Sequence, residues 1–107
     1  MYSIVSTAII HGIQSVPISV EADVSDGMPV FEMVGFLASE VQEAKERVRT
    51  ALKNCGYALT PKHITINFTP ANIRKSGSGF DLPVAVAVLT AFGYVRQELV
   101  GEYFVTG

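Results

Sequence analysis

A short glycine-broken loop, Arg74-Lys75-Ser76-Gly77-Ser78-Gly79, combines two cations with a backbone that can bend sharply. It stands directly before Phe80 and Asp81, where a long apolar segment begins. Backbone N–H groups of such a loop, next to a helix N-terminus, can surround an anion. The loop is therefore a candidate contact for a phosphate group. The alternative is a flexible loop whose Arg74 and Lys75 face water, and the sequence leaves both interpretations open.

A second basic feature is the spacing of Lys45, Arg49 and Lys53, which puts three cations on one flank of a helix. Residues 45–80 hold seven basic residues and one acid (+6), whereas residues 1–44 hold six acids and no Lys or Arg (−6), within a chain of net charge −2. With Arg74 and Lys75, this flank predicts a weak, sequence-independent contact with DNA phosphates or with an acidic surface of a neighbouring subunit. The alternative is a merely solvated face.

Enzymatic chemistry has little support in the sequence. The loop is not a Walker A motif, because Lys75 precedes the glycines, and no such motif occurs in the chain. Cys55 is predicted to be a core residue on an apolar helix face, and the loop serines have no evident histidine partner. His11 and His63, with one cysteine and no paired spacing, predict no metal site.

The segment that must position the loop runs from Asp81 to Gly93, and between these two residues only Thr90 is polar. We expect Asp81 to be the N-cap of a helix and Pro83 to lie in its first turn. The length and the closing glycine favour a helix over the alternative, a buried strand. A helix that is apolar on all sides is expected to be covered on all sides. It is too short to span a bilayer.

The first third of the chain predicts three strands. Residues 2–10 are mostly apolar, and residues 16–24 alternate between apolar and polar side chains, which is typical of a half-buried strand. Asp26-Gly27 supplies turn chemistry, and residues 29–34 follow as the next strand. We expect these strands to form a three-stranded meander.

A helix is predicted from Ser39 to Cys55, because Ser39 and Gln42 have the spacing of a capping box and Gly56 marks the end. Its apolar face comprises Val41, Ala44, Val48, Ala51, Leu52 and Cys55. Residues 64–69 alternate as a fourth strand, and residues 103–105 predict a fifth. The order βββ-α-β-α-β indicates a two-layer α+β fold.

The composition fits one packed domain covering residues 1–107, since 49% of the residues are hydrophobic and 17% are charged. The single cysteine excludes an internal disulfide, and no secretory signal is visible, so we expect a cytoplasmic protein without membrane contact. The chain stops at Gly107 without a polar tail, which we interpret as a fragment of something longer.

Several multi-residue blocks follow one family pattern. They are Ala8-x-x-x-Gly12, residues 20–29, Val34-Gly35-Phe36, Glu43 with residues 46–49, Pro70-Ala71-Asn72-Ile73-Arg74-Lys75 and residues 79–85. Together they resemble the N-terminal domain of the magnesium-chelatase-like AAA+ ATPases of bacteria, the YifB/ComM group. The resemblance covers the whole chain and implies a fold like domain 2 of ribosomal protein S5, which the Lon protease domain shares.

In that family this domain precedes a P-loop AAA+ module, so the resemblance implies ATP and Mg²⁺ for the missing module and no cofactor for this segment. It also implies a hexameric ring, with ComM-type members acting in DNA branch migration. The place of the Lon catalytic serine is occupied here by Leu82, Pro83 and Val84, so peptidase chemistry does not carry over.

The expectation is a noncatalytic accessory domain that helps the ring assemble or makes weak contact with DNA. We expect the isolated domain to hydrolyse neither peptides nor ATP. One alternative is a degenerate Lon-like peptide-binding module. The other is a fragment of a GHMP-kinase-like phosphate-binding enzyme, although the loop lacks that group's Gly-Leu-Gly-Ser-Ser run.

Overall fold

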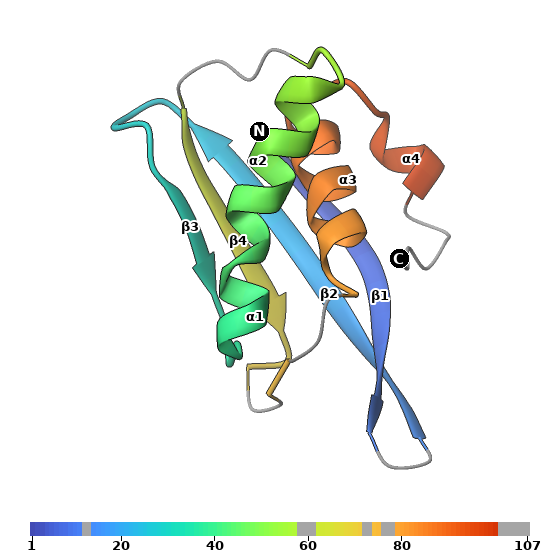
Figure 1. Cartoon of the computed structure of the whole chain (residues 1–107). Helices are drawn as coiled ribbons and strands as arrows, with labels where there is room; N and C mark the ends of the chain where they lie inside the picture. Colours follow the sequence, from blue (N-terminus) through green and yellow to red (C-terminus); the bar gives the residue numbers. More distant parts are fainter. Residues whose placement is uncertain (12–13, 58–61, 72–73, 76–78, 101–107) are drawn as a thin grey trace.

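The computed structural model describes residues 1–11, 14–57, 62–71, 74–75 and 79–100. Its elements are β1 (Tyr2–His11), β2 (Gln14–Ser25), β3 (Phe31–Val34), α1 (Ser39–Gln42), α2 (Ala44–Asn54), β4 (His63–Thr69), α3 (Asp81–Ala91) and α4 (Gln97–Val100). One layer is a four-stranded sheet, and α2 and α3 cover one of its faces (Figure 1). The predicted α+β class with two layers is confirmed, while the predicted strand at residues 103–105 lies outside the described residues.

The strand order in the sheet is β1-β2-β4-β3, so the predicted three-stranded meander is wrong. β1 and β2 form an antiparallel hairpin, but β2 pairs next with β4, over residues 19–25. This pairing takes the edge of β2 that a meander would have given to β3. β3 pairs instead in parallel with β4, from which it is separated in sequence by α1 and α2. A parallel pair requires such a crossover.

The strands bury the side chains that face the helices. In β2 these are Ile18, Val20, Ala22 and Val24, and in β4 they are Ile64, Ile66 and Phe68, all in the hydrophobic core. The intervening polar residues of both strands lie on the open face of the sheet. The period-two alternation in the sequence therefore predicted both strands and their inner faces correctly.

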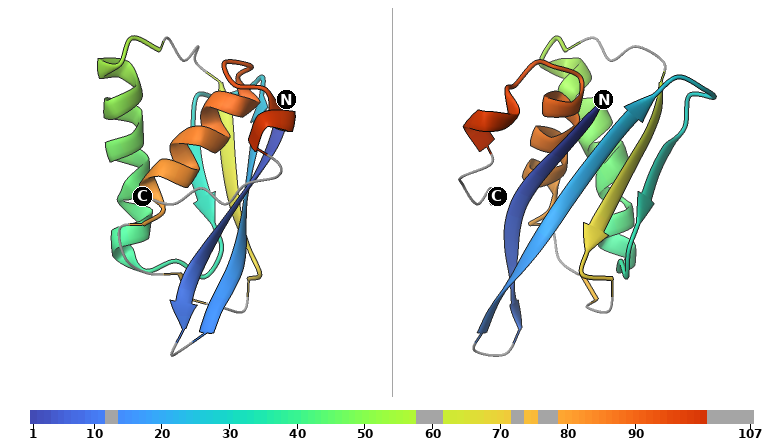
Figure 2. Two further views of the ribbon diagram at one scale, coloured as in Figure 1. Left: turned by 90° about the vertical axis from the view of Figure 1, so that its right-hand side faces the viewer. Right: turned by 180° about the vertical axis from the view of Figure 1, so that it is seen from behind.

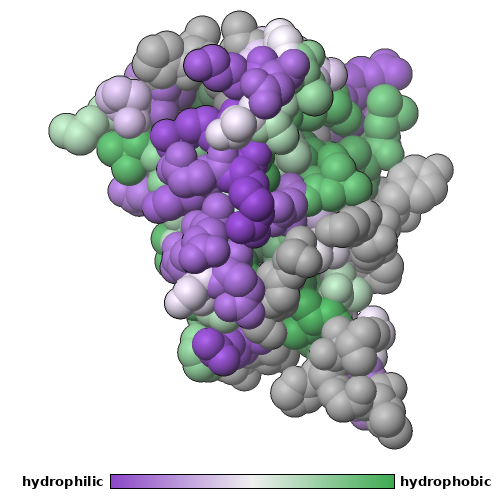
Figure 3. Space-filling model, in the orientation of Figure 1, coloured by the Kyte–Doolittle hydropathy of each residue, from purple (hydrophilic) through white to green (hydrophobic). Residues whose placement is uncertain are grey.

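α3 is the central helix: it packs against β1, β2 and α2. Val84, Ala87 and Val88 are completely buried. The expectation that it is covered on all sides is wrong, because Leu82 is 46% exposed and several neighbours on the outer side are only half-buried. In the space-filling view, apolar side chains reach the surface beside the polar covering of α2 (Figure 3).

Both predicted N-caps are wrong. The N-cap of α3 is Phe80, and Asp81 is the first residue of the helix itself. No side chain forms a capping hydrogen bond at this end of α3. Likewise Ser39 lies inside α1, whose N-cap is Ala38. The predicted single helix from 39 to 55 is interrupted at Glu43, which closes α1 and precedes α2. The Asp81 carboxylate and the Glu40 carbonyl accept hydrogen bonds from Arg47 instead, as described below.

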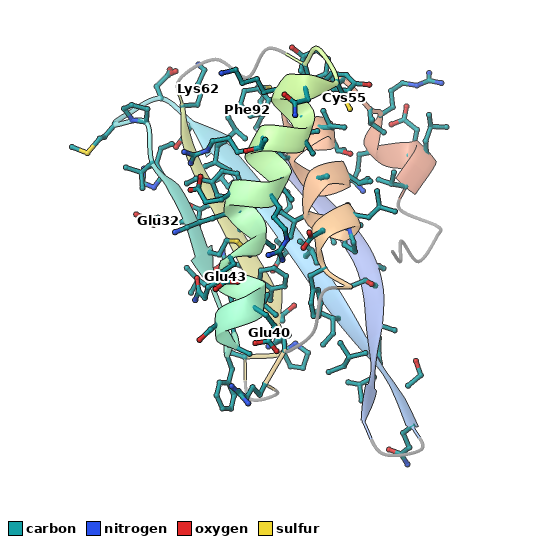
Figure 4. All side chains as sticks on the ribbon, viewed as in Figure 1. Glu32, Glu40, Glu43, Cys55, Lys62 and Phe92 are labelled. Carbon is teal, nitrogen blue, oxygen red and sulfur yellow. The ribbon has the colours of Figure 1, made fainter. Side chains whose placement is uncertain are left out.

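The predicted end of α2 is confirmed, because Gly56 has a φ of 87° and Tyr57 N–H donates to Leu52 O at 3.0 Å. The core prediction for Cys55 is wrong, since its thiol lies exposed at the end of α2, at the top of the molecule in Figure 4. The buried stripe of the two helices follows positions 41, 44, 48 and 52, which turns Ala51 and Cys55 outward. None of the described helices is long and apolar enough to cross a membrane.

Candidate interaction surface

The sequence blocks around Gly35 and around Lys75 meet at one end of the sheet. Gly35 has a φ of 135°, and a Cβ there would lie 3.0 Å from the backbone O of Phe68 and 3.2 Å from its Cβ. Both the backbone conformation and the close approach therefore require glycine. The chain can pass tightly over the end of β4 only because this position has no side chain.

The backbone of Lys75 fastens the loop before α3 to the turn between β3 and α1. Lys75 N–H donates to Phe36 O at 2.7 Å, and Ala38 N–H donates to Lys75 O at 2.8 Å. The pair is a small parallel bridge centred on Leu37. Two segments some forty residues apart in sequence are thus held as neighbours, and Ala38 is held at the start of α1.

The side chains of Arg74 and Lys75 do not form one cationic patch. Lys75 is 0% exposed, and its Nζ donates to the carbonyl O of Pro70. Burial lowers the pKa of the Lys75 ammonium group. Arg74 is exposed. The hypothesis that both residues contact an anion at the surface therefore does not fit the placement of Lys75, because two neighbours in an extended chain point in opposite directions.

The remainder of the predicted anion loop is only partly described. Ser76, Gly77 and Ser78 lie outside the described residues, and Gly79 is exposed in the turn that leads into α3. The next residue, Phe80, is buried and packs edge-to-face on Phe68, with ring centroids 5.4 Å apart. The loop is thus anchored at both ends, by Lys75 and by Phe80. Anion binding at its tip stays a prediction.

Arg47 is the main polar connection between the two long helices. Its Nε lies 2.7 Å and its Nη2 2.9 Å from the two carboxylate oxygens of Asp81, and Nη2 also donates to Glu40 O at 3.1 Å. Glu43 Oε2 is 4.0 Å from the same guanidinium. Figure 4 shows Glu40 and Glu43 at the end of the helical layer where the loop arrives. The hydrogen bonds to Asp81 raise the pKa of Arg47.

The predicted basic flank of Lys45, Arg49 and Lys53 lies on α2, and its middle member is engaged. The Arg49 guanidinium lies 5.5 Å from the centre of the Phe31 ring of β3, and 3.9 Å from Glu46 Oε1. Lys45 is half-buried and Lys53 is exposed. The middle of this flank therefore contacts β3, at the edge of the sheet, and the three cations are not equally available to a partner.

Four of the seven basic residues in the segment 45–80 have internal partners. These pairs are Arg47 with Asp81, Arg49 with Glu46, Lys62 with Asp26, and Lys75 with the Pro70 carbonyl. Within the described part of the chain, Lys45, Lys53 and Arg74 have no ion pair. Only Asp81 and Asp26 are acids from outside the segment, because Glu46 is already counted in the charge of +6. The fold therefore offsets part of this charge with acids from other segments.

Sequence reasoning missed the partnership of Arg47 with Asp81 and the close approach at Gly35. It also missed Glu32 and His63, whose Oε2 and Nε2 lie 3.6 Å apart between β3 and β4. The available signal was that Gly35, Arg47 and Asp81 belong to three of the blocks that carry the family resemblance. Among the described residues no group of three His, Cys, Asp or Glu side chains could hold a metal ion.

These features define a small α+β domain whose sequence motifs make internal contacts between its turns, loop and helices. A family model described as subunit ChlI of Mg-chelatase matches residues 20–107. The chain therefore belongs to the Mg-chelatase-like family, together with YifB and ComM.

Three relatives illustrate the similarity. The chain is 43% identical to the YifB proteins of Salmonella typhimurium and Escherichia coli, over 95% and 98% of its length and 22% of theirs. It is 38% identical to the competence protein ComM of Haemophilus influenzae, over 90% of its length and 20% of that protein. The chain thus spans about a fifth of the length of the curated relatives it matches.

Proposed function

We propose that this domain is a noncatalytic accessory domain of a Mg-chelatase-like AAA+ ATPase that acts in DNA processing of the ComM type. The observation that supports this role is where the family motifs lie. Arg47 and Asp81 join the helices, and Lys75 joins the loop to the turn, so these residues hold a scaffold together. ATP and Mg²⁺ would then bind to the AAA+ module of the same protein, outside this segment.

A Lon-like peptidase would need a nucleophilic side chain at the start of α3, and this chain has none there. The start of α3 carries Leu82, Pro83 and Val84, of which Pro83 and Val84 are buried and Leu82 is exposed. None of the three side chains can attack a carbonyl group. We therefore favour assembly and weak binding over catalysis, and purified domain should hydrolyse neither peptide nor ATP. Turnover that a single substitution in the domain abolishes would contradict this.

We assign the contact with DNA or with a neighbouring subunit to Lys53 and Arg74, which are exposed and have no ion pair among the described residues. Lys45 also has none there, but it is half-buried. So few phosphate contacts predict a Kd of about 10⁻⁴ M or weaker for the isolated domain at physiological salt. In a hexameric ring, however, several such contacts act together and raise the overall affinity. The binding surface would thus matter mainly in the assembled protein.

Charge reversal in the full-length protein tests this assignment. Lys53→Glu and Arg74→Glu together are expected to weaken DNA binding or ring assembly and to lower DNA-stimulated ATPase activity, more strongly at low than at high salt. Arg96→Glu is the matched control, because Arg96 is 72% exposed and its ion pair is with Glu98 of α4. If all three properties of the double variant equal those of the control at both salt concentrations, these cations are only a solvated surface.

A further inference from the structure

Phe36 lies in the turn after β3 and holds its ring in solvent. It is 52% exposed, although it is a large apolar side chain. The backbone is held on both sides of it, because Gly35 is packed against the end of β4 and Phe36 O accepts a hydrogen bond from Lys75 N–H at 2.7 Å. A single exposed apolar side chain needs no explanation by itself. The position of Phe36 becomes informative through the residue beside it.

That residue is Arg74, which lies next to Phe36 on the outward side of the bridge between turn and loop. The bridge pairs Leu37 with Lys75. Both of these side chains turn inward, since Lys75 is 0% exposed and Leu37 packs against the core. The residues that precede them therefore point outward, because side chains alternate along an extended chain. Phe36 and Arg74 are both exposed, as this geometry requires, and paired chains lie about 4.8 Å apart.

Neither side chain has a partner among the residues that the structure describes. Arg74 takes part in none of the ion pairs there. The aromatic and cation–π contacts of the described residues involve other rings. An exposed ring and an unpaired guanidinium thus lie side by side at the end of the sheet where β3 and β4 both finish, beside the start of α1 (Figure 2).

We infer that Phe36 and Arg74 hold one nucleotide of single-stranded DNA, with its base stacked on the Phe36 ring and its phosphate beside the Arg74 guanidinium. Aromatic side chains combined with cations bind single strands without reading their sequence. A guanidinium can donate two parallel hydrogen bonds to phosphate oxygens. This site rests on the DNA contact proposed above for Arg74, and it adds a base contact that requires an unpaired strand.

The chemistry favours a single strand over the other possible occupants. In a duplex the faces of each base are covered by its neighbours, so a side chain can stack only on a base that has left the helix. A stable protein interface needs about 800 Å² on each partner. One ring beside one cation matches the size and charge of one nucleotide.

Binding of labelled oligo(dT) and of a duplex of equal length to the full-length protein, measured by fluorescence anisotropy, tests the site. Phe36→Ala is expected to weaken single-strand binding about 5- to 100-fold, the loss of one stacked base, and to change duplex binding little. Phe36→Trp should keep the affinity, whereas Phe36→Leu, which is apolar but has no π-face, should lose as much as Phe36→Ala. Met28→Ala is the matched control, because Met28 is 75% exposed and precedes β3 at its other end.

A tryptophan at position 36 also reports stacking directly, since the chain contains no tryptophan. In the whole chain carrying Phe36→Trp, oligo(dT) above about 10⁻⁴ M should quench the fluorescence saturably. Inorganic polyphosphate should compete with the oligonucleotide without quenching, because it offers phosphates and no base. Met28→Trp should not respond to either. An unchanged urea midpoint shows that the substitution leaves the fold intact.

Several results would overturn the stacking site. They are single-strand binding by Phe36→Ala equal to that of the control, equal weakening for single strand and duplex, and wild-type affinity of Phe36→Leu. Loss of ring assembly in Phe36→Ala with oligonucleotide binding retained would show a protein-binding surface instead. If Lys53→Glu with Arg74→Glu abolishes DNA binding and Phe36→Ala does not, only the base contact is wrong. If the wild type binds neither DNA, the contact proposed above is wrong as well.

Discussion

The Arg47 guanidinium and the Asp81 carboxylate form a two-point ion pair, with contacts of 2.7 and 2.9 Å, between the first half of α2 and the first residue of α3. The same guanidinium reaches Glu40 O of α1. One side chain therefore connects α1, α2 and α3 at the end where the loop before α3 meets the turn before α1. Such a connection sets the position of the loop relative to the sheet.

Removing either partner of this pair should destabilise the domain. Arg47→Ala and Asp81→Ala are each expected to lower the urea midpoint of unfolding, and the double variant should be little worse than the more damaging single one, because both remove the same interaction. Arg47→Lys should rescue only part of the loss, since an ammonium group cannot make the two-point contact. Arg96→Ala is the surface control. Strictly additive losses would show that the two residues act separately.

Alanine substitutions at two glycines should distinguish the cost of backbone strain from the cost of a steric clash. Gly56 has a φ of 87°, and a Cβ added there would meet nothing within 4 Å, whereas Gly35 has a φ of 135° and would place its Cβ against Phe68. Gly56→Ala should therefore cost only the strain, about 1 kcal/mol. Gly35→Ala should cost about 1–3 kcal/mol more, because the strand end must also move. Equal losses for both variants, measured by urea unfolding, would exclude a role for the contact with Phe68.

The elements that sequence predicted well are those whose signal is local. Alternation at Ile18, Val20 and Ala22 reports one buried strand face directly, and the glycine that ends α2 acts within its own turn. The partner of a strand is not a local property. The turn before β3 predicts that this strand joins the neighbouring hairpin, whereas its actual partner, β4, begins about thirty residues later in the sequence.

The same limit applies to the candidate site. Asp81 has the residue type and position of an N-cap, but a guanidinium 34 residues away competes successfully for its carboxylate. Lys75 is adjacent to Arg74 in sequence, yet the side chain of Lys75 is buried and that of Arg74 is exposed. Summing charge over a segment likewise ignores partners such as Asp26, which binds Lys62 from outside the segment. The sequence can thus indicate which residues are candidates for a site, but it does not show which other residues they contact in the fold.

The position of α3 at the centre of the core leads to a simple comparison within one helix. Val88→Ala removes two methyl groups from a completely buried site and should cost about 2–3 kcal/mol of unfolding free energy. Leu82→Ala removes a larger group from a side chain that is 46% exposed, and should cost less than about 1 kcal/mol. Urea unfolding of the two variants measures both values. A smaller loss for Val88 than for Leu82 would mean that the core has been misplaced.

Because the ammonium group of Lys75 is buried, two substitutions at this position should have opposite effects on stability. Lys75→Met keeps the length of the side chain and removes the charge, so stability at pH 7 should be unchanged or higher, despite the lost bond to Pro70 O. Lys75→Ala leaves a void and should cost about 2–4 kcal/mol. If Met costs as much as Ala, the bond to Pro70 outweighs the penalty of burying the charge.

The pH dependence of stability gives an independent test of the same residue. Because burial lowers the pKa of Lys75 below its ordinary value of 10.5, the unfolded chain keeps this proton to a higher pH than the folded protein does. Stability should therefore rise as the pH increases from the folded-state pKa toward 10.5, and this gain is lost again as the pH falls. Lys75→Met should lack that rise, while Lys53→Met, at an exposed site on α2, should retain it. Urea midpoints of the wild type and both variants, measured from pH 7 upward, provide the comparison. Identical pH profiles for the wild type and Lys75→Met would show that the ammonium group is solvated in the folded protein.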